Sequence, residues 1–253
     1  MGTLSGKNAF ITGTSQGIGA ATAKALIEAG CNICMHYFHS GDVPFQLQKM
    51  AEARNQKAQC VKADLTKDEE AVKCVKTAVE SFGVFNVLVN NSGSLVGRRY
   101  LSEVDMDFWQ TSVDLNLKTM ILITRELLPY LDKKVGSSIV NLSSLAGRTG
   151  GHPGSLVYSA TKGAILTWTR ALSKELGPSG IRVNAVAPGF IEGTSFHSTH
   201  TTRESAIKTI QGIPLGRSGN PEDIARAIVF LASEYDGFIN GATLDINGGV
   251  YCA

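Results

Sequence analysis

The sequence has little of what marks a nucleic-acid-binding or membrane protein. Its 24 lysines and arginines are almost balanced by 22 acidic residues, which leaves a net charge of +2, and no long basic stretch is present. That balance argues against a nucleic-acid partner. No apolar run reaches the roughly 20 residues needed to cross a bilayer, so we expect no membrane association. The chain starts Met-Gly-Thr-Leu-Ser-Gly-Lys and runs straight into a strand-like segment, without the pattern of a signal peptide.

The sequence has only five cysteines, an odd number. The five cysteines lie mostly within apolar segments, which favours reduced thiols in a cytoplasmic protein. Cys31 and Cys34, followed by His36 and His39, imitate a metal site. However, residues 32–38 are typical of a strand, where positions three apart point to opposite faces. The two thiols would not converge, so we expect no metal and interpret them as small buried hydrophobes.

Strand-like and helix-like segments alternate along the whole chain, which predicts an α/β fold with a parallel sheet and helices on both faces. Hydrophobic residues make up 43% and charged residues 18% of the 253 residues, as in an ordinary globular protein. No linker or repeat interrupts the pattern, so we predict one domain over residues 1–253. Strands are expected at Asn8–Thr12, Asn32–Phe38, Ala58–Ala63, Asn86–Val89, Ser137–Leu142, Ile181–Val186 and Ala242–Ile246. Helices are expected at 18–29, 44–55, 67–82, 107–131, 156–176 and 221–232, with a variable segment at 189–211.

A glycine-rich turn connects the first strand to the first helix, in the run Thr12-Gly13-Thr-Ser-Gln-Gly17-Ile-Gly19. Gly13 permits a tight turn, Gly17 lets the backbone approach a pyrophosphate, and Gly19 lets the helix pack closely on the sheet. The helix N-terminus offers free N–H groups and a positive dipole end to phosphate. The alternative is a glycine turn without a ligand, but the strand–turn–helix context favours a dinucleotide site.

Small or polar residues follow four further strands. They are Asp64-Leu65, Asn90–Gly93, Ser143-Ser144 and Pro188-Gly189. Ligands of open parallel sheets bind beyond the carboxyl ends of the strands. We therefore expect these clusters and the glycine turn to form one binding rim.

Tyr158 and Lys162 are the strongest candidates for chemistry. They are four residues apart in a predicted helix and so lie on one face. A neighbouring ammonium favours the phenolate and lowers the tyrosine pKa, although a shift of three units needs roughly 4 kcal/mol. Ser143 or Ser144 could hold a carbonyl oxygen beside the phenol. Taken alone, such a pair is more often a packed ring and a solvated cation.

Together these residues resemble the short-chain dehydrogenase/reductase family over nearly the whole chain. The resemblance rests on Thr12-Gly13-x-x-x-Gly17-Ile-Gly19, Asp64, Asn90–Gly93, Asn116, Ser144, Tyr158-x-x-x-Lys162 and Pro188-Gly189. It implies a Rossmann-type sheet and hydride transfer between NAD(P)H and a carbonyl or alcohol. It further implies that Tyr158 is the general acid/base, that Lys162 lowers its pKa and holds the nicotinamide ribose, that Ser144 holds the substrate oxygen, and that Asn116 supports a proton relay through water.

The candidate cofactor-binding residues are Gly13, Ser15, Gln16, Gly17, Ile18, Gly19, His39, Asp64, Leu65, Asn91, Ser92, Gly93, Tyr158, Lys162, Pro188, Gly189, Ile191 and Thr194. Two of the implied roles have plain structural alternatives. Asn116 could bond its own helix backbone, and Asp64 could cap the following helix.

The sequence departs from the family pattern in three places. Ser144 lies fourteen positions before Tyr158, one more than usual, which leaves Ser143 open as the catalytic serine. Ser92 stands where alanine is commoner. Gly193 stands where the family has a threonine that bonds the nicotinamide amide, and a one-residue insertion would restore Thr194 to that role.

We predict an NAD(P)H-dependent reductase of a small polar carbonyl compound, such as a keto acid, a keto sugar or a 3-oxoacyl thioester. The alternative is a dinucleotide-binding regulator or scaffold without catalysis. The loop 191–211 is polar and so disfavours a greasy substrate. Arg98, Arg99 and Arg203 could meet an anionic substrate or could be solvated surface residues. The family resemblance further implies a homotetramer.

The end of the second strand lacks an acid. In dinucleotide sites an acidic residue there accepts the ribose 2′-OH of NAD and repels the phosphate of NADP. Here the run is His36-Tyr-Phe-His39-Ser40-Gly41, so NADP is permitted. No arginine is present in this run either, and Gln16 stands before Gly17. His39 and Ser40 could bond a 2′-phosphate, which predicts a modest NADPH preference of about 1–2 kcal/mol.

Overall fold

The computed structural model describes residues 4–194, 202–233 and 237–253. One parallel sheet of seven strands runs through it in the order β3-β2-β1-β4-β5-β6-β7. The strands are β1 Asn8–Ile11, β2 Asn32–Tyr37, β3 Ala58–Lys62, β4 Val87–Asn90, β5 Ser137–Leu142, β6 Ile181–Pro188 and β7 Thr243–Ile246. The order reverses between β1 and β4, because β1 pairs with both β2 and β4. That reversal is the place where open α/β sheets bind their ligands.

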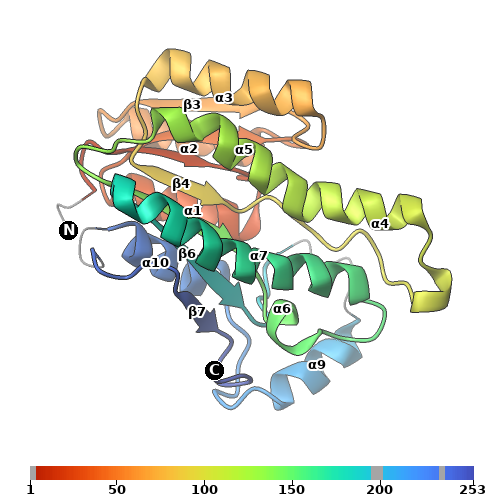
Figure 1. The fold of residues 1–253 in the computed structure, drawn as a ribbon. Coiled ribbons are helices and arrows are strands. Elements are labelled where there is room, and N and C mark those ends of the chain that lie inside the picture. The colour runs from red at the N-terminus through yellow and green to blue at the C-terminus, as the bar shows by residue number, and fades with distance from the viewer. Residues whose placement is uncertain (1–3, 195–201, 234–236) are drawn as a thin grey trace.

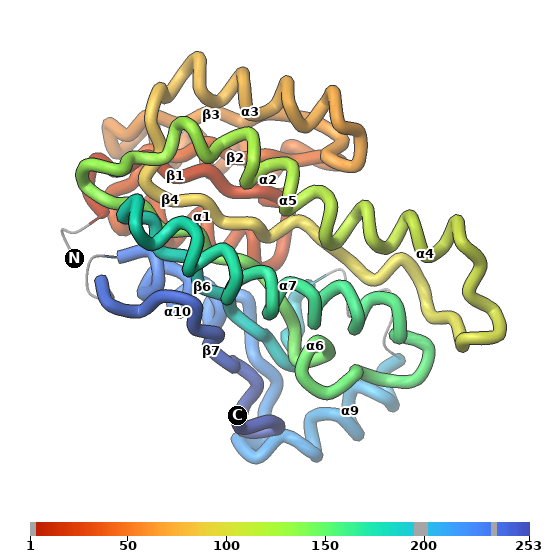
Figure 2. Tube along the Cα trace, in the orientation of Figure 1, coloured from red at the N-terminus to blue at the C-terminus, as the bar shows by residue number. Residues whose placement is uncertain are grey.

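Helices cover both faces of the sheet (Figure 1). On one side lie α1 Gly17–Glu28, α2 Asp42–Glu52 and α10 Pro221–Ala232, and on the other α3 Asp68–Phe82, α5 Thr119–Leu127 and α7 Leu156–Leu176. Figure 2 shows the same three layers as a trace. The parallel sheet with helices on both faces confirms the predicted α/β Rossmann-type fold.

Among the described residues, none of the helices combines the length and apolarity that a bilayer crossing requires.

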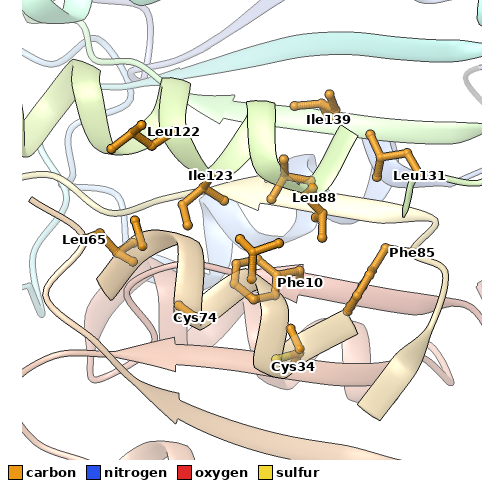
Figure 3. Packing of buried hydrophobic residues seen from close by; sticks show 14 of the residues in the cluster. Phe10, Cys34, Leu65, Cys74, Phe85, Leu88, Leu122, Ile123, Leu131 and Ile139 are labelled. Atoms are coloured by element: carbon orange, nitrogen blue, oxygen red, sulfur yellow. The ribbon is translucent and has the colours of Figure 1, made fainter. Parts of the chain in front are cut away.

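Each face of the sheet has its own hydrophobic cluster. Phe10, Leu88 and Ile139 belong to the cluster beneath α3 and α5 (Figure 3). Phe10 meets Phe85 edge-on, with ring centroids 6.0 Å apart. Neighbouring positions on the same strands, among them Ile11 and Val140, belong to the opposite cluster. Such strands are apolar on both faces because helices cover both.

The cysteines follow this two-sided packing. Cys31 lies in one cluster and Cys34 in the other, on opposite faces as the strand periodicity predicts. All five cysteines are free thiols. Within the described part of the chain, no group of three or more His, Cys, Asp or Glu residues is arranged to hold a metal ion.

The predicted helix at 107–131 is present as one continuous helical segment, but it is not a regular α-helix throughout. The segment consists of α4 Met106–Val113, a π-helical turn at Asp114–Lys118, α5, and a 3-10 turn at Leu128–Tyr130. Among the described residues, two short α-helices were not predicted: α6 Ala146–Thr149 and α9 Arg203–Gln211, the latter within the segment expected to be variable. Figure 1 shows α6 and α9 beyond the ends of β6 and β7, on the side where the candidate site lies.

Candidate active site

The glycine turn after β1 has the backbone geometry that its sequence predicts. Gly13 and Gly17 adopt φ values of +73° and +57°, in the left-handed region that favours glycine. Gly19 has a different reason to be glycine, because a Cβ there would lie 2.1 Å from the carbonyl oxygen of Gly13. The turn therefore keeps its backbone open and close to whatever binds at the start of α1.

The end of β4 is tied to this turn by hydrogen bonds. The Thr12 hydroxyl accepts from the backbone N–H groups of Asn91 and Ser92, both at 3.0 Å. The Asn91 amide donates to the carbonyls of Thr12 and Gly13, both at 2.9 Å. The two strand ends beside the switch point thus form one rigid wall, and the Ser92 hydroxyl packs against Gly13.

Tyr158, Ser144 and Lys162 meet at the first turns of α7. The hydroxyl of Ser144 is hydrogen-bonded to the phenol of Tyr158. The Lys162 ammonium lies 5.7 Å from the centre of the Tyr158 ring and donates to the Leu142 carbonyl at 2.9 Å. A Cβ on Gly93 would lie 3.1 Å from the same ammonium and 2.7 Å from the Asn116 Oδ1. The Lys162 ammonium and the Asn116 Oδ1 therefore both lie close to the Gly93 backbone.

Burial dominates the charges of this pair. It raises the pKa of Tyr158 to about 12, and the hydrogen bond from Ser144 works in the opposite direction. It lowers the pKa of Lys162 to about 8. The neighbouring ammonium was expected to lower the tyrosine pKa, but the net shift is upward. Removal of both groups from water opposes charge on either of them.

The two adjacent serines are oriented differently. The Ser143 hydroxyl is buried and donates to the backbone carbonyl of Lys162 at 2.7 Å, which fixes the end of β5 to α7. The half-buried Ser144 hydroxyl faces Tyr158 and accepts from the Ala146 N–H at 3.1 Å. Only Ser144 of the two is bonded to the phenol.

The short helix α6 holds Ser144 in place. Gly147 lies so close to α7 that a Cβ would be 2.7 Å from the Lys162 carbonyl carbon. Arg148 forms two 3.0 Å bonds with the Asp245 carboxylate on β7 and lies over the Tyr251 ring. The segment after Ser144 is therefore anchored to both α7 and the edge strand.

Asn116 lies inside the π-helical turn and is fully buried. Its amide donates to the carbonyls of Ser94 and Ser112 at 2.9 and 3.0 Å, and its Oδ1 accepts from the Ser94 N–H at 3.0 Å. The bond to its own helix matches the structural alternative, whereas the pair with Ser94 holds the loop after Gly93. Isolated π-turns frequently occur at functional sites.

The remaining strand ends complete the rim. Asp64 Oδ1 accepts from the Thr66 N–H and hydroxyl at 3.1 and 2.7 Å. Desolvation raises its pKa, but the Thr66 hydrogen bonds outweigh this and the net shift is downward. Asp64 is not the cap of α3, since Lys67 occupies that position. Beside it, the Leu65 side chain is buried.

On the other side of the switch point, the residues after β6 reach back toward the glycine turn. The Pro188 carbonyl accepts from the Leu145 N–H at 2.8 Å, and the Gly189 N–H donates to Ile246 at 2.9 Å. Ile191 is buried. Thr194 packs on Gly17, with its Cγ2 3.2 Å from where a Cβ on Gly17 would be. The insertion of Gly193 thus leaves Thr194 facing the glycine turn.

The end of β2 and the start of α1, where a 2′-phosphate is expected, include exposed residues. Ser15 donates its hydroxyl to the Ser40 carbonyl at 2.8 Å, which joins the glycine turn to the end of β2. The Ser40 hydroxyl bonds Asp42 at 2.9 Å, while His39 is exposed beside the Phe38 ring. Gln16 is exposed and Ile18 half-buried at the start of α1. The space next to His39 and Gln16 is therefore open to solvent.

Comparison with known proteins agrees with this geometry. The family model described as enoyl-(acyl carrier protein) reductase matches residues 13–251. A 3-oxoacyl-[acyl-carrier-protein] reductase of Synechocystis is 35% identical over 251 residues, 99% of each chain. The crystal structure of a blue fluorescent protein from a metagenomic library, in complex with NADPH, superposes with a TM-score of 0.91 at 30% identity, covering 99% of this chain and 100% of the other. The crystal structure of an NADH-dependent reductase responsible for alginate metabolism superposes with a TM-score of 0.89 at 32% sequence identity, covering 99% of each chain.

The chain belongs to the short-chain dehydrogenase/reductase family. It is accordingly an NAD(P)-dependent oxidoreductase acting on C=O and CH–OH groups.

Two of the arginines considered for substrate binding in this short-chain dehydrogenase/reductase are engaged elsewhere. Arg99 pairs with Asp105 at 2.5 Å and lies over the Phe108 ring at 4.5 Å. Arg98 donates to the Pro153 carbonyl at 3.3 Å, in the turn that precedes α7. Arg203 is exposed in the first turn of α9. Ser195, His197, Ser198, His200 and Thr201 of the polar loop lie outside the described residues.

One residue that supports the site from behind was missed. His36 was considered only as a false metal ligand and as part of a strand end that lacks an acid, yet its ring contacts the backbone of the glycine turn. A polar side chain inside an otherwise apolar strand was the available signal, because buried polar groups almost always have hydrogen-bond partners.

Proposed function

We propose that this short-chain dehydrogenase/reductase uses NADPH to reduce a small polar carbonyl compound, with 3-oxoacyl thioesters as the preferred class. The main support is the bonded pair of Ser144 and Tyr158 beside the buried Lys162. Two adjacent hydroxyls suit a carbonyl oxygen, which needs a hydrogen-bond donor at rest and a proton when it becomes an alcohol.

Tyr158 is proposed as the general acid and Ser144 as the group that orients the substrate oxygen. With its pKa raised to about 12, Tyr158 is protonated at neutral pH and can supply the proton that reduction consumes. Lys162 would hold the ribose and, when charged, favour the phenolate left after proton donation. Asn116 would steady the Ser94 backbone and support reprotonation through water. The nicotinamide supplies the hydride when it is bound.

The described residues fit a dinucleotide. A Cβ on Gly13, Gly17 or Gly19 would press on neighbouring protein atoms, so these glycines keep the turn tight next to the N-terminus of α1, where a phosphate would bind. Asp64 and Leu65 would contact the adenine, and Asn91 to Gly93 the adenosine ribose. Pro188, Gly189 and Ile191 would bracket the nicotinamide, and Thr194 would reach its amide from above Gly17. Ser15, Gln16 and Ile18 would lie along the phosphates.

The proposed preference for NADPH rests on the end of β2. The run His36 to Gly41 contains no acid to repel a 2′-phosphate. His39, within this run, has an exposed side chain. The Ser40 hydroxyl is engaged with Asp42, so His39 is the stronger candidate contact. The NADPH complex of the structurally similar metagenomic protein supports this choice, whereas the alginate-related reductase is described as NADH-dependent.

The proposed substrate class rests on the relatives. The 3-oxoacyl-[acyl-carrier-protein] reductase of Synechocystis matches across the whole chain. Keto acids and keto sugars are the next classes to test, and one structural neighbour is a reductase responsible for alginate metabolism.

The test is a panel of 3-oxoacyl thioesters, keto acids and keto sugars, each assayed with NADPH and NADH. We expect the highest kcat/KM for a 3-oxoacyl thioester with NADPH, and a shift toward NADH in His39→Asp. A clear preference for bulky hydrophobic ketones would contradict the substrate proposal. An NADH preference of tenfold or more in the wild type, or a ratio unchanged in His39→Asp, would contradict the cofactor proposal.

We further propose that the protein is a cytoplasmic homotetramer built from one domain. Several large apolar side chains are exposed around α4, with Leu101 at 76% and Met106 at 70% exposure, together with Tyr100 and Trp109. An exposed group of this kind often marks a protein–protein contact. Sedimentation velocity measures the assembly directly, and a monomer at micromolar concentration would contradict it.

A further inference from the structure

The His36 side chain uses both ring nitrogens inside the protein. The residue lies in β2 and is 3% exposed. Its Nδ1 is 3.1 Å from the backbone nitrogen of Gly13, and its Nε2 is 3.0 Å from the carbonyl oxygen of Ala63. One ring therefore spans from the glycine turn to the residue before Asp64, across two strand ends.

These two partners fix the state of the ring. A backbone N–H can only donate, so Nδ1 must be the unprotonated acceptor for Gly13. A carbonyl can only accept, so Nε2 carries the hydrogen that is donated to Ala63. The ring is thus the neutral Nε2–H tautomer. Protonation at Nδ1 would set two N–H groups against each other.

The backbone of His36 holds the same turn a second time. Its carbonyl accepts from both the N–H and the hydroxyl of Thr14, each at 3.0 Å. The side chain and the main chain of a single residue therefore restrain Gly13 and Thr14, while the far side of the ring restrains the start of the Asp64 loop. Gly13 has a positive φ, so its peptide orientation depends on such restraints.

We infer that His36 is a positioning residue that sets the glycine turn relative to the Asp64 loop for dinucleotide binding. The inference rests on the proposed NADPH-dependent function and assigns no contact between His36 and the cofactor. The peptide of Gly13 begins the turn that would approach the pyrophosphate, and Asp64 follows directly on Ala63. Loss of the Nδ1 acceptor would therefore leave the Gly13 peptide free to shift against the Asp64 wall, whereas loss of the Nε2 donor alone would leave Gly13 held from β2.

Two amide variants separate the two contacts. In His36→Asn, the Oδ1 occupies roughly the place of Nδ1 and can still accept from Gly13. In His36→Gln, the longer amide reaches the place of Nε2 and can still donate to Ala63, but the acceptor for Gly13 is lost. Met35→Leu is the matched control, because Met35 is a buried neighbour in β2 that packs in the hydrophobic cluster, and such volume-conserving changes are well tolerated.

The dissociation constant of NADPH, measured by titration without a carbonyl substrate, tests the inference. We expect His36→Gln to raise it about tenfold, and His36→Asn and Met35→Leu to stay within about threefold of the wild type. At saturating NADPH, kcat should be little changed in all three, because the acid and its partners are untouched.

Unchanged NADPH affinity in a folded His36→Gln would overturn the inference, and so would equal losses in His36→Asn and His36→Gln. If His36→Gln does not fold, a weakened His36→Asn beside an unaffected Met35→Leu overturns it, and unchanged affinity of His36→Asn supports it. A wild-type protein that binds neither NADPH nor NADH would instead overturn the proposed function itself.

Discussion

At the scale of single residues, burial rather than charge sets the ground state of the site. Tyr158 and Lys162 are both withdrawn from water, so the pKa of the phenol rises to about 12 and that of the ammonium falls to about 8. The raised pKa keeps the Tyr158 phenol protonated at neutral pH, so it can donate a proton to an alkoxide-like oxygen. The lowered pKa of the ammonium makes the charge of Lys162 sensitive to mildly alkaline pH.

Removal of the phenol oxygen should separate catalysis from binding. Tyr158→Phe keeps the ring and its packing on α7 but lacks the proton donor, so we expect a loss of kcat of at least 10²-fold. The unfolding temperature and the NADPH dissociation constant should stay close to those of the wild type. Wild-type turnover of a good substrate by this variant would show that another group supplies the proton.

The pH dependence should report the buried lysine. The charged form of Lys162 is present below its pKa of about 8 and is lost as the pH rises through that value. Since kcat/KM for the cofactor reflects the free enzyme, we expect it to fall tenfold per pH unit above about 8. Rates measured from pH 6 to 10 check this, and a flat profile up to pH 10 would rule out a role for that charge.

The sequence predicted which residues lie at the site better than it predicted their states. The i, i+4 spacing of Tyr158 and Lys162 and the position of Ser144 after a strand were sufficient to bring the three together. The choice between Ser143 and Ser144 needed the structure, because the direction of each hydroxyl depends on how β5 meets α7. The direction of the tyrosine pKa shift needed it too, since desolvation depends on packing from distant segments.

At the scale of elements, close backbone approaches decide where the glycine turn and α1 can lie. A methyl group on Gly19 would contact backbone atoms of Gly13, not a movable side chain. The strand–turn–helix unit was predicted from its glycines, whereas α9 and the π-turn were not. For α9 the available signal was Thr202, whose side chain caps the helix. The π-turn is tied to a distant segment, because its Asn116 bonds the Ser94 backbone.

Gly19→Ala should therefore damage both stability and binding. We expect unfolding to become easier by about 1–3 kcal/mol through overpacking, with a weaker affinity for NADPH. Gly163→Ala is the control, because a Cβ there would meet the Gly147 oxygen at an ordinary 3.5 Å. That helix substitution should be neutral or stabilising by up to about 1 kcal/mol. Thermal unfolding and NADPH titration of both variants measure the contrast, and equal behaviour would refute it.

At the scale of the whole molecule, the neutral His36 links global stability to pH. Burial lowers its pKa from 6.5 to about 4, while the Ala63 hydrogen bond and the nearby Asp64 work in the opposite direction. Between these values the unfolded chain binds a proton that the folded protein does not. The contribution of the neutral His36 ring to the free energy of unfolding is therefore complete above about pH 6.5 and is lost as the pH falls toward 4.

We expect the wild type to lose about 3 kcal/mol more stability than His36→Gln between pH 7 and pH 4. Asp64 titrates in both proteins, so the difference between their stability curves isolates the imidazole. Urea unfolding at a series of pH values measures it. Parallel curves would mean that His36 binds its proton as readily in the folded protein as in the unfolded chain.

The π-turn at Asp114–Lys118 also bears on how this chain tolerates changes in length. A π-turn holds one residue more than an α-helical turn, so it behaves as a single inserted residue. Deletion of Leu115 would let α4 and α5 join as one regular α-helix. The buried faces of α4 and α5 would keep their present directions relative to each other. A deletion within α5, such as that of Ile121, would instead rotate every later side chain by about 100°. The segment can therefore lose a residue and still fold, but the shortened helix would no longer present Asn116 to Ser94.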